Sequence, residues 1–144
     1  MGNQHPWQIS IEDNPHGTDW WRYRTSIDRH ASEGGVLGAS SPATLRQFLP
    51  EKHQYILSPS WDHHDNPFAC LSCGDAGAGR VYQTVDLWIG RDPLDMPWED
   101  YAILSGLLQA EGLCEYISNY RRRMFDSASA VFWQYNDSCP VTHG

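Results

Sequence analysis

The fold of this chain is decided by the stretch Ile27-Asp-Arg-His-Ala-Ser-Glu-Gly-Gly-Val-Leu-Gly38. Residues 27–33 predict a short strand, although polar side chains interrupt its apolar pattern. Glu33 ends this strand, and Gly34 and Gly35 follow it directly. Because glycine has no Cβ, the backbone can turn sharply here and leave room for a ligand beside the carboxylate. A carboxylate that ends a strand and opens into a loop is typical of the catalytic groups of (β/α)₈ enzymes.

Length and charge limit the possible functions. The 144 residues correspond to one domain, and the 40% hydrophobic content is sufficient for a core. A net charge of −8 with ten basic residues argues against a nucleic-acid partner, which requires clustered Lys and Arg. The sequence contains no apolar run long enough to span a membrane, and its first 25 residues lack the apolar region of a signal peptide. We therefore expect neither nucleic acid nor membrane as a partner, and we assign no cellular compartment.

Helix signals occur in the first half of the chain. Asp19–Arg24 predicts a short helix. Ser41 and Pro42 are a typical N-cap and first-turn proline for a second helix, which we expect to end before Pro50. The stretch 51–80 is rich in His, Asp, Pro and Gly, and we expect it to be irregular.

A longer helix is predicted to begin near Pro97. Glu99 and Asp100 suit the first turn of such a helix because its N-terminus carries a partial positive charge. Gly106 and Gly112 are positions at which the helix could bend or split. Apolar residues recur at helical spacing and predict one buried face, formed by Ile103, Leu107, Ala110, Cys114, Ile117 and Met124.

The last predicted element is the apolar and aromatic run Ser129-Ala-Val-Phe-Trp-Gln-Tyr135. Such a run is typical of a strand that is buried on both faces of a parallel sheet. The predicted order is therefore strand, helix, long loop, helix and strand, which is the βα pattern of the α/β class.

Several motifs resemble glycoside hydrolase family 2. Phe132-Trp-Gln-Tyr-Asn-Asp137, followed by Pro140, resembles the last barrel strand of that family. Arg29-His-Ala-Ser-Glu-Gly-Gly35 is similar to its strand-seven motif, in which the Glu is the catalytic nucleophile. Two further segments, Ser41–Pro50 and Ser58–Asn66, are similar to β-mannosidase-like members of the family. Gly2–Trp7 is similar to the loop that follows the preceding barrel strand.

The resemblance implies a fold and an activity. It implies that residues 1–144 form a partial (β/α)₈ TIM barrel, the last two to three βα units at the carboxyl-terminal end of the catalytic domain. The activity implied is that of a retaining exo-β-glycosidase acting on a β-mannoside or related β-glycoside, without cofactor or metal. The partners implied are the carbohydrate substrate, the remainder of the barrel and flanking β-sandwich domains. Family members carry their general acid/base as the Glu of an Asn-Glu pair, and no such context is found in this chain.

The resemblance also assigns site residues. Glu33 would be the nucleophile, and Trp133 would form the floor of the sugar subsite. The other expected substrate-binding residues are Trp7, His5, Asn136 and Asp137. The chain departs from the family pattern at Gly34-Gly35 and at Ser138-Cys139-Pro140, which leaves the nucleophile in place and the sugar specificity open.

Two other functions fit parts of the sequence. Seven Trp and seven Tyr are compatible with a carbohydrate-binding module without catalysis, although a Trp more often fills a core. Trp61-Asp-His-His-Asp65, followed by Cys70 and Cys73, offers possible zinc ligands for an interaction domain. Against zinc, the chain has only one Cys-x-x-Cys pair and no second ligand pair at finger-like spacing.

Overall fold

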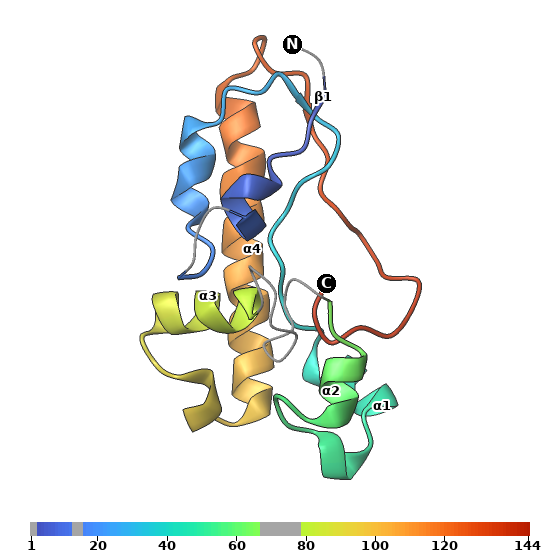
Figure 1. Ribbon diagram of the computed structural model, residues 1–144. Helices are drawn as coiled ribbons and strands as arrows, with labels where there is room; N and C mark the ends of the chain where they lie inside the picture. The colour runs from blue at the N-terminus through green and yellow to red at the C-terminus, as the bar shows by residue number, and fades with distance from the viewer. Residues whose placement is uncertain (1–2, 13–15, 67–78) are drawn as a thin grey trace.

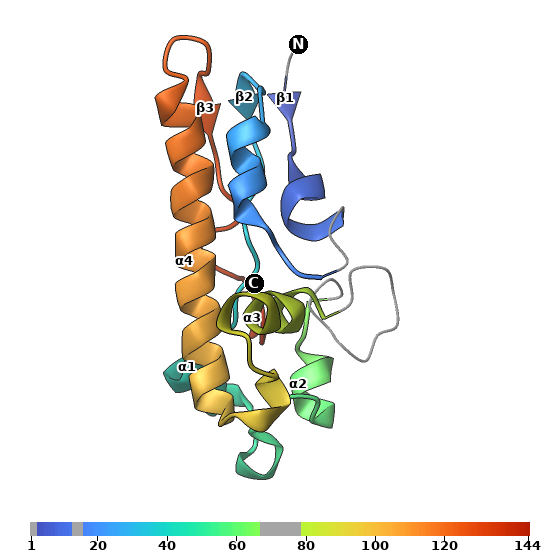
Figure 2. The same cartoon turned by 90° about the vertical axis from the view of Figure 1, so that its left-hand side faces the viewer.

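A small parallel sheet and one long helix organise the structure, a computed structural model that describes residues 3–12, 16–66 and 79–144. Its three strands have the order β1-β2-β3 and comprise β1 Asn3–Gln4, β2 His30–Ala31 and β3 Ser129–Ala130. The long helix α4, Trp98–Arg122, runs beside them (Figures 1 and 2). The other helical segments are η1 Gln8–Glu12, η2 Trp20–Thr25, α1 Pro42–Phe48, η3 Glu51–His53, α2 Pro59–His63, α3 Arg80–Ile89 and η4 Pro93–Asp95.

All three strands are parallel, with His30 of β2 paired to Asn3 on one side and to Ser129 on the other. Parallel neighbours require a crossover connection, which is usually helical. The connection from β1 to β2 contains η1 and η2, and that from β2 to β3 contains α1 to α4. The predicted class, α/β with parallel strands, is therefore confirmed.

The strands are shorter than the sequence predicts. The strand expected over residues 27–33 is formed only by His30–Ala31. The strand expected over residues 129–135 ends at Ala130, and the prediction that this run is buried on both faces is wrong. Trp133 and Tyr135 are 57% and 89% exposed. The reason is that β3 lies at the sheet edge, so that β2 is its only strand neighbour among the described residues.

Helix α4 begins directly after Pro97, as predicted, and continues without interruption through both glycines. Gly112 is needed for close packing rather than for a bend. A Cβ at this position would lie 2.6 Å from Cγ2 of Val36, well inside van der Waals contact. The helix therefore approaches the segment after β2 more closely than any side chain at position 112 would allow. No helix of residues 3–12, 16–66 and 79–144 has the length and apolarity required to cross a bilayer.

The predicted buried face of α4 is wrong except at Ile117, which is partly buried and packs against the core. Ile103, Leu107 and Met124 are 52%, 59% and 66% exposed, and Ala110 and Cys114 are exposed as well. The buried face combines aromatic rings with small or polar residues, namely Tyr101, Ala102, Ser105, Gly112, Glu115, Tyr116, Asn119 and Tyr120. Tyrosine rings fill the space beneath the helix, and the hydroxyl groups of Tyr101 and Tyr116 form hydrogen bonds there. The aliphatic periodicity therefore pointed to the opposite side of the helix.

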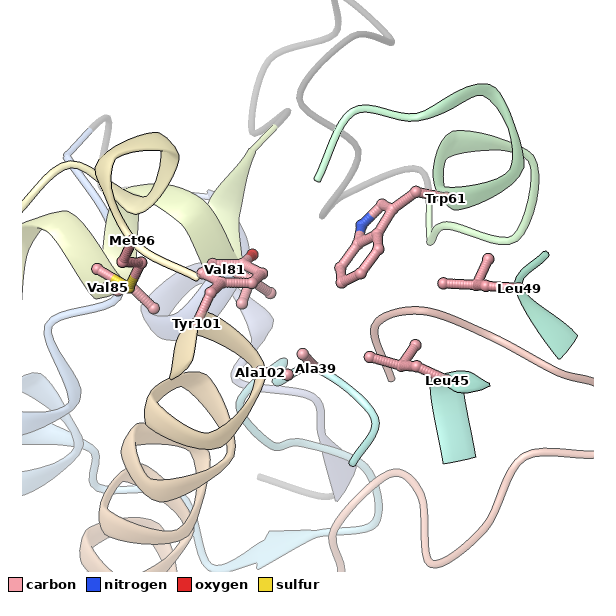
Figure 3. Close-up of a cluster of buried hydrophobic side chains, with 9 residues drawn as sticks. All are labelled: Ala39, Leu45, Leu49, Trp61, Val81, Val85, Met96, Tyr101 and Ala102. Atoms are coloured by element: carbon pink, nitrogen blue, oxygen red, sulfur yellow. The ribbon is translucent and has the colours of Figure 1, made fainter. Parts of the chain in front are cut away.

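Two hydrophobic clusters form the core. The first, shown in Figure 3, joins α1, α2, α3 and the start of α4 and contains Ala39, Leu45, Leu49, Trp61, Val81, Val85, Met96, Tyr101 and Ala102. The second lies between the sheet, η2 and the end of α4 and contains Ile9, Trp20, Tyr23, Ala31, Val36, Tyr116 and Tyr120. The second cluster therefore packs the sheet against η2 and the end of α4.

Local capping accounts for α1 and η2, two of the helices that were predicted correctly. The Ser41 hydroxyl accepts a hydrogen bond from the Thr44 amide at 3.2 Å, and α1 begins at Pro42. The Asp19 carboxylate accepts from the Trp21 amide at 3.2 Å and caps η2, which is a 3₁₀ helix. In both cases a side-chain acceptor satisfies an amide that has no partner within the helix.

Residues 51–66 and 79–80 are more regular than predicted. They contain η3, α2 and the first residue of α3, a helix that was not predicted. The signal for α3 was present, because Val81, Val85 and Trp88 recur at spacings of four and three residues before Gly90. Gly90 ends the helix in the left-handed conformation, with φ of 69°.

A buried polar chain ties the carboxyl-terminal residues to the first cluster. His143 Nδ1 lies 2.6 Å from Asp65 Oδ1, and its Nε2 lies 2.8 Å from the Tyr101 hydroxyl. Burial raises the pKa of Tyr101 well above its ordinary value. Gly38 and Gly144 exchange two backbone hydrogen bonds of 3.0 Å. These contacts fix the far end of the loop that leaves β3.

Glu115 of α4 connects the helix to η2 through two arginines. It accepts hydrogen bonds from Nε and Nη2 of Arg24, at 3.0 and 3.3 Å, and from Arg122. The Glu115 side chain is 11% exposed. The bonds from Arg24 lower the pKa of Glu115, partial burial opposes this effect, and Arg122 reinforces it.

Replacing Glu115 by Gln should lower the free energy of unfolding near neutral pH, because both guanidinium groups lose an ionised acceptor. The unfolded-state pKa is about 4.3, and the folded-state pKa lies below its ordinary value. The advantage of the unmodified chain is thus complete above the unfolded-state pKa and disappears as the pH falls through the folded-state pKa. Urea unfolding followed by circular dichroism, at low protein concentration, measures the stability of both chains near neutral pH and at acidic pH. Equal stability near neutral pH would contradict the role of this carboxylate.

Candidate active site

The predicted site residues follow three neighbouring strands. His5 and Trp7 follow β1, Glu33 follows β2, and Trp133 follows β3. Because the strands are parallel and adjacent, their carboxyl ends meet at one edge of the sheet (Figure 2). The structure therefore gathers at one edge residues that are about a hundred positions apart in sequence.

Glu33 is the centre of this arrangement. Its Oε2 accepts a hydrogen bond from the indole Nε1 of Trp7 at 3.1 Å, and the same oxygen lies 3.0 Å from Nδ1 of His5. The Glu33 side chain is 27% exposed, so the carboxylate is held by protein on one side and still reached by solvent. Both neighbours approach Oε2 rather than Oε1. The carboxylate thus has one oxygen fixed by donors and a second oxygen on which neither of these donors acts.

A second set of hydrogen bonds orients His5. Its Nε2 lies 3.1 Å from the Ser32 hydroxyl, and the Ser32 amide donates to Asn3 Oδ1 at 3.1 Å. An ionised carboxylate accepts only, so Nδ1 of His5 carries the proton that faces Glu33. In the neutral imidazole, Nε2 then accepts from the Ser32 hydroxyl, and in the imidazolium it donates to it. Asn3 and Ser32 were not identified from the sequence, although their places beside His5 and Glu33 were a usable signal.

Gly34 and Gly35 serve a different purpose from the one predicted. A Cβ at Gly34 would lie 2.9 Å from the Tyr116 hydroxyl, and one at Gly35 would lie 2.9 Å from the Trp133 carbonyl oxygen. The Trp133 amide donates to the Gly34 carbonyl at 2.7 Å. The space beside these two glycines is therefore filled by protein. The expectation that they leave room for a ligand is wrong; they allow the segments after β2 and β3 to approach each other.

Trp133 is connected to the Glu33 segment through its backbone, while its side chain is 57% exposed. The peptide bond between Trp133 and Gln134 is cis. An exposed indole next to the Glu33 loop is compatible with a stacking surface for a ligand. It does not pack as a core residue of the described chain.

Asn136 and Asp137 lie farther along the same loop and are exposed. Asp137 Oδ1 accepts from Nε2 of Gln134 at 2.6 Å, and a Cβ on Gly144 would lie 2.8 Å from Asp137 Oδ2. The contacts of Asp137 are thus within its own loop and with the carboxyl terminus. They support a role in shaping the loop, and the expected contact with substrate stays a prediction for both residues.

The possible zinc ligands are engaged in protein contacts. His64 Nδ1 lies 3.0 Å from the Pro140 carbonyl, and Asp65 is bound to His143. Over residues 3–12, 16–66 and 79–144, no group of three or more His, Cys, Asp and Glu side chains is arranged to hold a metal ion. Cys70 and Cys73 lie outside the described residues.

The comparison with solved structures agrees with the family resemblance of the sequence motifs. No protein-family model and no curated protein sequence matches the chain. Among solved structures, the crystal structure of the β-D-mannosidase from Dictyoglomus thermophilum matches with a TM-score of 0.77 and 24% sequence identity. The match covers 99% of this chain, which spans 16% of the length of that enzyme. The chain therefore has the fold of a segment of a β-mannosidase, as the resemblance of its motifs predicted.

Proposed function

We propose that this chain is part of the catalytic domain of a retaining exo-β-glycosidase, with Glu33 as the nucleophile. The environment of Glu33 carries the proposal: a partly exposed carboxylate follows the middle strand, and Trp7 and His5 both bind its Oε2. The fold shared with a β-mannosidase supports the same class of reaction. A β-mannoside or a related β-glycoside is the substrate that fits this relationship.

The two donors on Glu33 suit a nucleophile. They fix the orientation of the carboxylate, and a nucleophile must be held in line with the atom that it attacks. With Oε2 held by Trp7 and His5, Oε1 is the oxygen that we assign to the attack. In this arrangement His5 and Trp7 position the nucleophile, in addition to the substrate contacts expected from the sequence.

The reaction proceeds in two displacement steps. Oε1 of Glu33 forms a bond to the anomeric carbon as the bond from that carbon to the aglycone oxygen breaks, and a general acid protonates the departing oxygen. Water, deprotonated by the same group, then attacks the anomeric carbon and releases Glu33 as a carboxylate. Two inversions give net retention of configuration.

The second carboxyl group of this mechanism would come from outside the chain. In a retaining enzyme it stands about 5–5.5 Å from the nucleophile. We assign it to the remainder of a (β/α)₈ barrel, in which β1, β2 and β3 are the last three strands and residues 1–144 are the carboxyl-terminal portion. β1 and β3 are the sheet edges of the described residues, so each has a side on which a further strand can pair. Flanking β-sandwich domains would complete the protein.

Replacing Glu33 by Ala, in a polypeptide that carries the whole barrel, should lower kcat by several orders of magnitude, because no oxygen remains to attack the anomeric carbon. Azide should restore part of the turnover by entering the space left by the carboxylate. The Ala variant should still bind substrate, which separates catalysis from a carbohydrate-binding role. Steady-state assays with aryl β-mannosides test both, and near-normal turnover would remove Glu33 from the mechanism.

Replacing Trp133 by Ala should weaken binding of a transition-state analogue without unfolding the protein. A stacked ring contributes about 0.5–1.5 kcal/mol beyond its buried area, and this indole is already 57% exposed. The matched control is Trp7→Phe, which keeps a ring but removes the N–H group that binds Glu33. The control should lower kcat more than it raises KM. Loss of folding in Trp133→Ala, with unchanged kinetics of the remaining protein, would make Trp133 a core residue instead.

The chain made alone should associate and should fail to hydrolyse glycosides that have poor leaving groups. Contiguous exposed apolar surface favours association, and Val131, Phe132 and Tyr135 are all exposed beside the open edge of β3. General acid assistance is typically worth about 10²–10⁴-fold, and the proposed acid lies elsewhere. Light scattering and assays with good and poor leaving groups measure the two properties. A monomer that turns over the poor leaving group would show that the acid is within these residues.

A further inference from the structure

A surface pocket of about 390 Å³ lies between η2 and α3. We name it the Trp21 pocket; its lining residues are His16, Asp19, Trp21, Leu87 and Trp88. None of them belongs to the Glu33 site, whose side chains follow the strands. Figure 1 shows η2 and α3 on the same side of α4. The size falls in the range of pockets that hold small organic ligands.

The floor of the Trp21 pocket is rigid. Trp88 stacks on the buried ring of Trp20 with 4.0 Å between centroids and 15° between planes. The Trp88 indole N–H donates to the Thr18 carbonyl at 2.9 Å. The ring of Trp88 is therefore fixed from below by stacking and at its edge by a hydrogen bond.

Trp21 forms a wall that is equally well held. Its side chain is 46% exposed and meets Trp88 edge-on, with centroids 6.5 Å apart. The guanidinium of Arg24 lies 4.1 Å from the centre of the Trp21 ring, and the Glu115 carboxylate holds Arg24 in place. A ring supported in this way loses little conformational freedom when a ligand binds, which is a property of preorganised binding sites.

Polar groups at the rim define the ligand. Asp19 Oδ1 accepts from the Trp21 amide, and a carboxylate has further acceptor positions for ligand hydroxyl groups. The Arg24 cation already occupies a face of Trp21, which disfavours a cationic ligand there, and the charge of Asp19 disfavours an anionic one. The remaining class of ligand is neutral. It has an apolar ring face that can stack on the indoles and hydroxyl groups that can donate to the Asp19 carboxylate. A pyranose has this combination.

We infer that the Trp21 pocket binds one pyranose unit of a neutral oligosaccharide, as a second carbohydrate site separate from Glu33. The inference stands on the contacts of η2, α3 and Glu115 and does not require that Glu33 be catalytic. One sugar ring has few atoms through which to gain free energy, so a dissociation constant of about 1–10 mM is expected. Such a site would retain a polymeric substrate near the barrel.

Saturation-transfer difference NMR of residues 1–144 with β-1,4-mannotriose tests the inference, and it tolerates association of the chain. Titration should give saturable binding. Trp21→Ala should weaken it about tenfold, because the stacking wall is removed, and Trp21→Phe should restore part of the affinity. Asp19→Asn keeps an N-cap residue and should weaken binding a few-fold. Tyr55→Ala removes an exposed ring that belongs to neither site, so it is the matched control and should leave this binding unchanged.

Circular dichroism verifies that each variant is folded. If Trp21→Ala does not fold, the affinities of Trp21→Phe and Asp19→Asn test the inference instead. Unchanged affinity in the Trp21 and Asp19 variants would overturn the inference. So would loss of binding in Trp133→Ala alone, which would place the sugar at the strand ends. Absence of any saturable signal with mannotriose would overturn it as well. The Glu33→Ala chain should still bind mannotriose. This result would show that binding at the Trp21 pocket does not depend on the proposed catalytic role of Glu33.

Discussion

The close contact of Tyr116 with the segments after β2 and β3 is the interaction on which the candidate site depends. Tyr116 is fully buried, and its hydroxyl donates to the Val131 carbonyl at 2.9 Å. Its ring lies where a side chain at position 34 would be, so the loop that begins with Glu33 lies directly against α4. Burial raises the pKa of Tyr116, which keeps the hydroxyl protonated as a donor. One side chain therefore sets the positions of two strand ends.

The adjacent residue extends this support to the other side of the molecule. Glu115 holds Arg24, and Arg24 covers Trp21 in the pocket between η2 and α3. Consecutive residues of one helical turn thus organise two separate sites, one at the strand ends and one on the outer surface. Small residues make this possible, because Gly112 lets α4 approach Val36 without a clash. The helix is consequently a rigid common frame for both sites.

The proposed place of the chain in a larger barrel would account for the exposed apolar residues beside β3. Ile103 and Leu107 on the outer face of α4, and Phe132 beyond β3, are each more than a third exposed. Isolated exposed apolar residues are common, but Phe132 directly follows β3, an edge strand of the described sheet. A complete barrel has no open edges, since closure pairs its first and last strands. The surface that is exposed beside β3 is the surface that such closure would cover.

The sequence by itself determined the local features: the class, the capped starts of α1 and η2, the start of α4, and Glu33 at a strand end. These depend on neighbours a few residues away, where capping and proline geometry act. Only the tertiary structure decided which face of α4 is buried and which residues hold Glu33. Trp7 is 26 residues from Glu33 in sequence, and only the pairing of β1 with β2 brings them together. The glycines after Glu33 were likewise misread, because their neighbours, Tyr116 and Trp133, come from distant segments that only packing brings together.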